Sequence, residues 1–80
     1  MTERLNTDKR IVGAKQVRRA LDANMVDMVY IADDADKKVI DEIEMFCRNK
    51  QIQVIHVETM EKLGKACKID ISAATAALLK

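Results

Sequence analysis

The 80-residue chain has few of the residues from which catalytic and cofactor sites are usually built. It contains one histidine, two cysteines, two glycines and no proline or tryptophan. With Gly13 and Gly64 alone, a phosphate-binding loop of the Gly-x-x-x-x-Gly-Lys type is excluded. Cys47 and Cys67 have neither metal-ligand spacing nor a disulfide framework, so we expect buried free thiols and a cytoplasmic protein. His56 falls within a predicted strand, where we expect it to have a structural role.

Aromatic residues and long apolar runs are also scarce. Tyr30 and Phe46 are the only aromatic residues, and both lie in segments that are predicted to be core. A stacking platform of the kind that binds single-stranded nucleic acid is therefore excluded. No apolar run approaches the length of a membrane span, and the N-terminus lacks the apolar segment of a signal peptide. We therefore expect no membrane partner.

Charge is plentiful but unevenly distributed along the chain. The net charge is +1, from 14 basic and 13 acidic residues. Residues 1–19 have a net charge of +4, residues 22–44 of −6 and residues 48–80 of +3. If the two basic ends meet in space, they form a nucleic-acid-binding patch that the nearly neutral total conceals.

The hydrophobic pattern predicts one α/β domain over residues 1–80, a three-layer α/β/α sandwich. Asn24 follows the first predicted helix, where a left-handed residue is usual. The second helix joins two parallel strands by a right-handed crossover. From residue 13 to Cys67 the predicted elements are a helix over 13–21, a strand over 28–32, a helix over 36–49, a strand over 52–57 and a short helix after an N-cap at Thr59.

The helix predicted over residues 13–21 has the most informative pattern. At about 100° per residue, its apolar residues share one face, and the opposite face carries Lys15, Gln16, Arg18 and Arg19. That exposed face has three cations and no acid, and basic side chains near a helix N-terminus oppose the helix dipole. It is either an ordinary solvated surface or one that meets an external anion, and the pattern alone leaves both open.

Three carboxylates follow the first core strand, at Asp33, Asp34 and Asp36. Ligands bind at this edge of open α/β sheets, so the cluster could hold Mg²⁺ or serve as a phosphoacceptor site. Alternatively, the acids stabilise the N-terminus of the helix that begins near Asp36. Phosphoacceptor domains need more strands than this chain can supply, which favours the second interpretation.

Three short motifs occur in an order and spacing that are typical of one protein family. They are Val12-Gly-Ala-Lys-Gln-Val-Arg-Arg-Ala-Leu21, Ile31-Ala-Asp-Asp-Ala-Asp36, and Leu63-Gly-Lys-Ala-Cys67 followed by Ile69-Asp-Ile71. Over residues 9–79 the chain resembles the ribosomal L7Ae family, and its bacterial kink-turn-binding branch, the YbxF-type proteins, looks most similar. Members of that family are not enzymes. They bind the kink-turn, a sharply bent RNA element with a bulge followed by tandem sheared G·A pairs.

The resemblance implies an RNA-binding surface that begins at the basic helix. Gly13 would let the helix start approach the RNA backbone closely, because glycine has no side chain and helix N-termini bind anions, and Ala14 beside it is also a candidate contact residue. Lys15 and Gln16 would reach the guanine edges of the sheared pairs. Arg19 matches a basic residue of the family on the same face.

Other segments would complete that surface. Asp36 lies where some members present an acid to the bulged nucleotide, and residues 69–71 match the loop that covers the bulge. Charge and placement add Arg18 and Lys65 as phosphate contacts. The candidate residues in these segments are therefore Arg18, Asp36, Lys65, Ile69, Asp70 and Ile71.

The resemblance also implies a partner and a mode of action. The partner is structured RNA that contains a kink-turn, in ribosomal RNA or a riboswitch, and we expect no DNA, cofactor, metal or catalysis, and a monomeric protein. The resemblance implies that the alanine-rich residues 73–79 form a strand, although propensity alone predicts a helix, so the expected sheet is small, mixed and four-stranded. Two other hypotheses stay open: a small Mg²⁺-dependent or phosphoacceptor domain using Asp33 and Asp34, and a protein-interaction subunit whose basic faces serve solubility.

Overall fold

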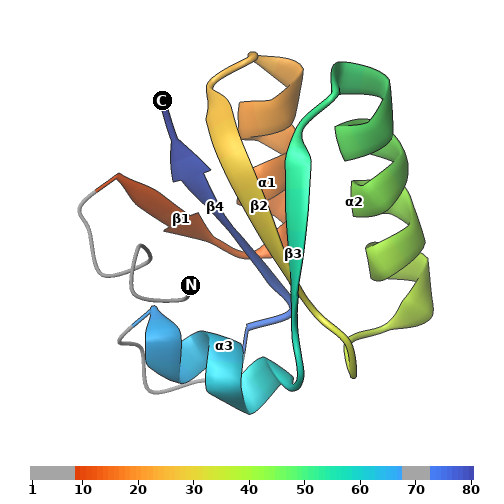
Figure 1. Cartoon of the computed structure of the whole chain (residues 1–80), viewed down its shortest axis with the longest axis vertical. Helices are drawn as coiled ribbons and strands as arrows, with labels where there is room; N and C mark the ends of the chain where they lie inside the picture. The colour runs from red at the N-terminus through yellow and green to blue at the C-terminus, as the bar shows by residue number, and fades with distance from the viewer. Residues whose placement is uncertain (1–8, 68–72) are drawn as a thin grey trace.

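The computed structural model describes residues 9–67 and 73–80. Helices α1 and α2 cover one face of a four-stranded sheet, and α3 packs on the other (Figure 1). The predicted α/β/α fold is confirmed. In chain order the elements are β1 (Arg10–Val12), α1 (Ala14–Asp22), β2 (Val26–Ala32), α2 (Lys37–Lys50), β3 (Gln53–Val57), α3 (Met60–Ala66) and β4 (Thr75–Leu79).

The sheet is mixed, with the strand order β1-β4-β2-β3. β2 and β3 are parallel, with Tyr30 opposite Ile55, so α2 forms the predicted crossover. β4 runs antiparallel to both of its neighbours, placing Ala77 opposite Ile11 on one side and Val29 on the other. As a result β1, β2 and β3 all end at the edge of the sheet where β4 begins.

The alanine-rich segment forms the central strand β4, as the family resemblance implied. Ala76 and Ala77 are both fully buried, the first in the core under α3 and the second in the core under α1 and α2. Small side chains on both faces let the two helical layers approach the strand closely. Burial between two neighbouring strands therefore outweighs the helical preference of alanine.

The two faces of the sheet have separate apolar cores. Tyr30 and Leu63 lie on the α3 side, and Val17, Leu21 and Ile43 lie on the side of α1 and α2. The latter three are no more than 1% exposed, which confirms the predicted apolar stripes of both helices. None of the helices in the described residues is long and apolar enough to span a membrane.

Both cysteines are buried free thiols, as predicted. Burial raises the pKa of the Cys47 thiol to about 11, and the negative charge of Glu44 adds to this effect. Burial likewise raises the pKa of Cys67, against an opposing contribution from Arg10. Both thiols are therefore protonated and unreactive at neutral pH.

Helix ends follow local chemistry. The Thr59 side chain accepts a hydrogen bond from the backbone N–H of Lys62 at 3.1 Å and is the predicted N-cap of α3. Asn24 has the predicted left-handed backbone, with φ of 58°. Gln51, which ends α2, is also left-handed, with φ of 57° and ψ of 41°, and this was not predicted. A side chain with a Cβ is strained in that conformation.

Replacing Gln51 with glycine should stabilise the protein. Gln51→Gly removes the strain of a left-handed Cβ and should add about 1 kcal/mol to the free energy of unfolding. Gln53→Gly is the matched control, since Gln53 is an equally exposed glutamine but lies in strand β3. That control should lower stability by about 0.5–1 kcal/mol. Urea unfolding measures both, and a loss of stability in Gln51→Gly would contradict the reasoning.

Alkylation should report the burial of Cys47. A pKa of about 11, against an ordinary value of 9.0, leaves roughly 100-fold less thiolate at pH 8 than in the unfolded chain. Iodoacetamide should therefore modify native Cys47 at least about 100-fold more slowly than in the urea-unfolded protein. The native rate should rise with pH toward 11. Equal rates in the native and unfolded protein would show that the thiol is accessible and unperturbed.

Candidate nucleic-acid interface

Two of the three sequence motifs meet at the edge of the sheet where β4 begins, the lower edge in Figure 1. The backbone N–H of Gly13, at the start of α1, donates to the carbonyl oxygen of Thr75 at 2.9 Å. Ala32, at the end of β2, donates to the carbonyl oxygen of Ala74, also at 2.9 Å. The start of β4 thus ties the first motif to the second.

The third motif is tied to the same edge through α3. The first residue of α3, Met60, donates its backbone N–H to Asp34 Oδ1 at 2.7 Å. The carbonyl oxygen of Met60 accepts from the backbone N–H of Ala73 at 3.1 Å. Cys67, which follows α3, is buried. Ile69, Asp70 and Ile71, predicted to cover the bulged nucleotide, lie outside the described residues.

The start of α1 leaves room for a ligand backbone. Gly13 has φ of 106° and ψ of 141°, a conformation that is essentially restricted to glycine. Apart from its chain neighbours, none of the described atoms lies within 4 Å of the position where a Cβ would be. No side chain from the described part of the chain caps the helix, so the amides of its first turn can face an anion.

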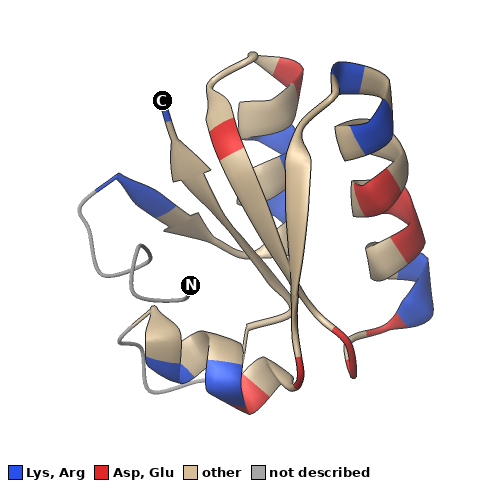
Figure 2. Ribbon diagram, viewed as in Figure 1, with Lys and Arg blue, Asp and Glu red and all other residues tan. Residues whose placement is uncertain are grey.

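The basic face of α1 is oriented as the helical pattern predicts. Lys15, Gln16 and Arg19 are exposed, and Val17 on the opposite side is fully buried. Lys15 and Arg19 form no ion pair with any residue of the described ranges, 9–67 and 73–80. Figure 2 shows further basic residues at the start of α2 and on α3. The uncommitted cations of α1 therefore stand next to the open helix start.

Arg18 is placed differently from the other two cations. Its Nη1 atom lies 2.5 Å from Glu42 Oε1 on α2, so an acid from a neighbouring helix engages it. The sequence pattern had identified no acid within the predicted helix that neutralises this face. The predicted role of Arg18 as a phosphate contact stays a prediction, with its guanidinium turned toward α2.

A shallow hollow lies between α1 and α2, beside the basic face. Phe46 lines it and is only partly buried, although its segment was predicted to be core. Glu42 lies one turn before Phe46 on the same flank of α2, so both side chains face α1. Sequence reasoning identified neither as part of the site, because their position depends on how the two helices pack. The full lining is Lys15, Arg18, Arg19, Asp22, Glu42 and Phe46.

The three clustered carboxylates are each engaged by the protein. Asp36 Oδ1 accepts from the backbone N–H of Lys38 at 2.9 Å and caps α2, which confirms the helix-terminus interpretation for this residue. Asp34 accepts a hydrogen bond from the first backbone N–H of α3, that of Met60, and Asp33 pairs with His56. Among the described residues, no three histidine, cysteine or acidic side chains are grouped so that they could hold a metal ion. These engagements weigh against the Mg²⁺ and phosphoacceptor hypothesis.

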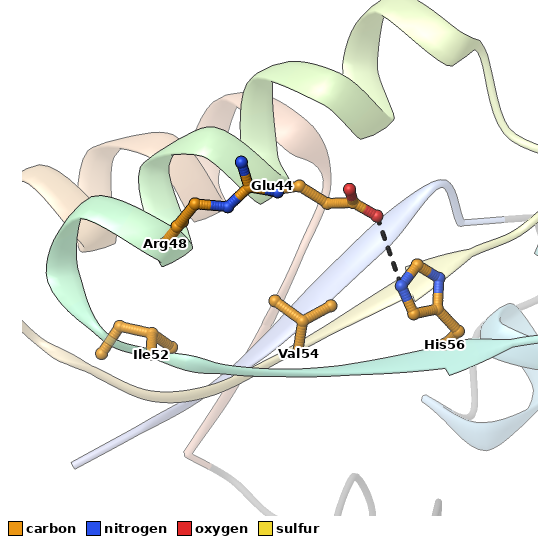
Figure 3. A pocket seen from close by; sticks show the side chains of 5 residues that line it. All are labelled: Glu44, Arg48, Ile52, Val54 and His56. Carbon is orange, nitrogen blue, oxygen red and sulfur yellow. Dashed lines mark ion pairs between the residues drawn. The ribbon is translucent and has the colours of Figure 1, made fainter.

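His56 lies in β3, as predicted, and links this strand to two other elements. Its Nδ1 atom is 2.7 Å from Asp33 Oδ1, and its Nε2 atom is 3.3 Å from Glu44 Oε1 on α2. Figure 3 shows His56 at one end of an open hollow between α2 and β3. Arg48, Ile52 and Val54 also line this hollow. His56 therefore connects β3 with the loop after β2 and with α2, which is a structural role.

Lys65 is exposed on α3, with Nζ 3.2 Å from Glu61 Oε1. A similar pair lies nearby, with Lys62 Nζ 2.6 Å from Glu58 Oε2. The hydrogen bond from Lys62 lowers the pKa of Glu58. Pairs as exposed as these hold their partners weakly. Lys65 therefore remains able to exchange Glu61 for a phosphate, as its predicted role requires.

Comparison with known proteins gives consistent matches. A sequence model of the ribosomal protein L7Ae/L30e/S12e/Gadd45 family matches residues 1–80. An RNA-binding protein from Caldanaerobacter subterraneus subsp. tengcongensis is 46% identical over 69 residues, covering 86% of this chain and 84% of its own. RNA-binding protein YbxF from Geobacillus stearothermophilus is 38% identical over 76 residues, covering 95% and 93%.

A solved structure extends the likeness at the level of the fold. The 15.5kD RNA binding protein of Giardia lamblia has a TM-score of 0.88 and 20% identity, covering 99% of this chain and 68% of its own. At that identity the match supports the α/β architecture alone. It agrees with the strand order and helical layers described above.

Asp36 variants should test whether this residue stabilises α2 as its cap. Asp36→Ala removes the cap of α2 and should lower the free energy of unfolding by about 1 kcal/mol, whereas Asp36→Asn keeps an accepting oxygen and should cost little. Asp41→Ala, at an exposed acid inside the same helix, is the control and should not destabilise. Urea unfolding compares the three. If both Asp36 variants are as stable as the wild type, the cap is unimportant.

Proposed function

The chain belongs to the ribosomal protein L7Ae/L30e/S12e/Gadd45 family, and we propose that it is an RNA-binding protein that recognises and stabilises kink-turns. The observation that carries this proposal is the arrangement at the start of α1. Lys15 and Gln16 are exposed in the first turn of α1, beside the uncapped helix start at Gly13. Arg19 is exposed one turn later on the same face as Lys15, and neither cation forms an ion pair within the described residues. The RNA-binding names of relatives that are 46% and 38% identical support it.

Base recognition would come from the exposed face of α1. The major groove of regular A-form RNA is deep and narrow, so a helix reaches base edges only where the RNA is bent or opened. A kink-turn supplies such a site. The Lys15 ammonium can donate to the O6 and N7 acceptors of guanine, and the Gln16 amide can both donate and accept. Buried Val17 anchors this face to the protein, so the two side chains are presented from a rigid element.

Backbone recognition would surround the base contacts. The first-turn amides of α1 and the open space beside Gly13 suit a phosphate, and the cations of Arg19 and Lys65 add long-range attraction. Asp36 lies at the same edge. Its Oδ1 atom caps α2, and its second carboxylate oxygen, Oδ2, can face the bulged nucleotide. The role of residues 69–71 as a cover over that nucleotide is part of this proposal.

Binding would act on the RNA rather than catalyse a reaction. A kink-turn exchanges between extended and bent shapes, and a protein that binds only the bent one shifts the population toward it. We propose that the protein does this as a monomer in the cytoplasm, on ribosomal RNA or a riboswitch. Such a role needs neither cofactor nor metal.

A gel shift with two RNAs tests the proposal. One RNA carries a kink-turn, and in the other the sheared G·A pairs are replaced by Watson–Crick pairs. The wild type should bind the first more tightly. Lys15→Ala/Gln16→Ala should weaken kink-turn binding by about 10-fold or more, because each lost base contact reduces discrimination. Its binding to the second RNA should change much less.

A matched control uses the same two residue types elsewhere. Lys50 and Gln51 are adjacent at the far end of α2, where Lys50 Nζ lies 2.8 Å from Asn24 Oδ1. Lys50→Ala/Gln51→Ala makes the same change in charge and composition away from the proposed interface. It should retain kink-turn affinity. Equal binding of the wild type to both RNAs would overturn kink-turn recognition, and equal effects of the two double variants would overturn the assignment to α1.

A further inference from the structure

One ion pair crosses between the two helices on the same face of the sheet. Arg18 Nη1 on α1 lies 2.5 Å from Glu42 Oε1 on α2. The two side chains are 42% and 43% exposed, so the pair sits at the surface, where a ligand can reach it. It is the described contact in which an acid of α2 neutralises a cation of the basic face of α1.

Arg18 occupies the flank of the basic face. At about 100° per residue, Lys15 and Arg19 point within about 40° of each other, and Arg18 points about 60° to the other side of Lys15. That direction is toward α2, and Arg18 and Glu42 both line the hollow between the helices. Arg18 is therefore the cation of α1 that is farthest from the base-reading direction and nearest to an acid.

We propose that Glu42 is a specificity-determining residue, which holds the Arg18 guanidinium away from RNA phosphates. This inference rests on the RNA-binding function proposed above. Phosphate contacts carry no sequence information, so an additional free cation on this face would strengthen binding to any RNA. By engaging Arg18, Glu42 removes one such contact while leaving Lys15, Gln16 and Arg19 free to act. This proposed role of Arg18 replaces its predicted role as a phosphate contact.

A free Arg18 would favour the wrong complexes more than the right one. On a kink-turn, base contacts by Lys15 and Gln16 would fix the register of α1, and Arg18 would still point toward α2. On other RNAs no base contact sets the register, so the helix can turn until a freed Arg18 meets a phosphate. Glu42 therefore lowers nonspecific affinity more than specific affinity, in the manner of a repulsive or blocking element that sets specificity.

Glu42→Gln tests the inference, with Asp41→Asn as the matched control. Asp41 is an exposed acid on the same helix, so both variants change the net charge by the same amount. Glu42→Gln should tighten binding to the RNA without G·A pairs by about 3- to 10-fold at roughly 0.1 M salt. The slope of log affinity against log salt should steepen by about 0.9, the value for one added phosphate contact. Kink-turn affinity should rise less than about twofold, so the specificity ratio falls.

A double-mutant cycle identifies Arg18 as the group that Glu42 controls. In an Arg18→Gln background, Glu42→Gln should behave like Asp41→Asn, because no guanidinium remains to be released. Thermal unfolding of each variant gives a second readout. If Glu42→Gln destabilises the protein but leaves affinity and salt dependence equal to those of Asp41→Asn, the pair is structural and the inference is wrong. A gain that persists without Arg18 also overturns it.

Failure of the inference and failure of kink-turn recognition are distinguishable. The effect of releasing Arg18 is measured as the affinity for the RNA without G·A pairs, compared between Glu42→Gln and Asp41→Asn. This comparison does not depend on any preference for kink-turns. A wild type that binds both RNAs equally overturns kink-turn recognition and leaves the effect of Glu42 measurable. A protein that binds neither RNA in any variant overturns both.

Discussion

Thr75 joins the parts of the molecule from which the candidate interface is built. Its carbonyl oxygen accepts from Gly13 at the start of α1, and its hydroxyl donates to the carbonyl oxygen of Tyr30 in β2 at 2.7 Å. Thr75 is fully buried at the first position of β4, so neither bond competes with water. Thr75 thereby fixes the start of α1 relative to β2. The three acids Asp33, Asp34 and Asp36 follow the end of that strand. The exposed side chains can be arranged as a surface only because this buried junction places them.

Local patterns predicted most of the elements, and packing decided the rest. Periodicity identified both long helices and the strands β2 and β3, and capping chemistry identified Thr59 and Asn24 correctly. β4 required the family resemblance, since alanine favours helix unless two strands and two helical layers enclose it. The left-handed Gln51 had no residue signal at all, because glutamine is not a residue that favours that conformation.

The candidate site divides in the same way. Exposure of Lys15, Gln16 and Arg19 follows from the helical period alone. The Arg18–Glu42 pair joins residues 24 apart, and the hydrogen bond from Met60 to Asp34 joins residues 26 apart. Such contacts depend on the angle between two helices and on the path of a loop, which no local pattern contains. Sequence therefore shows which side chains are free to act, and the fold shows which are already engaged.

The position of β4 between β1 and β2 has a consequence for the order of events during synthesis. β1 leaves the ribosome early, yet its sheet partner is the strand encoded last among the seven elements. Until β4 emerges, β1 has no neighbour, and β2 is paired on one side only. Contacts of such large sequence separation make folding slower than in a locally connected chain. The basic segment of α1 is therefore synthesised before the junction at Thr75 can form, and the candidate interface can be assembled only once β4 has emerged.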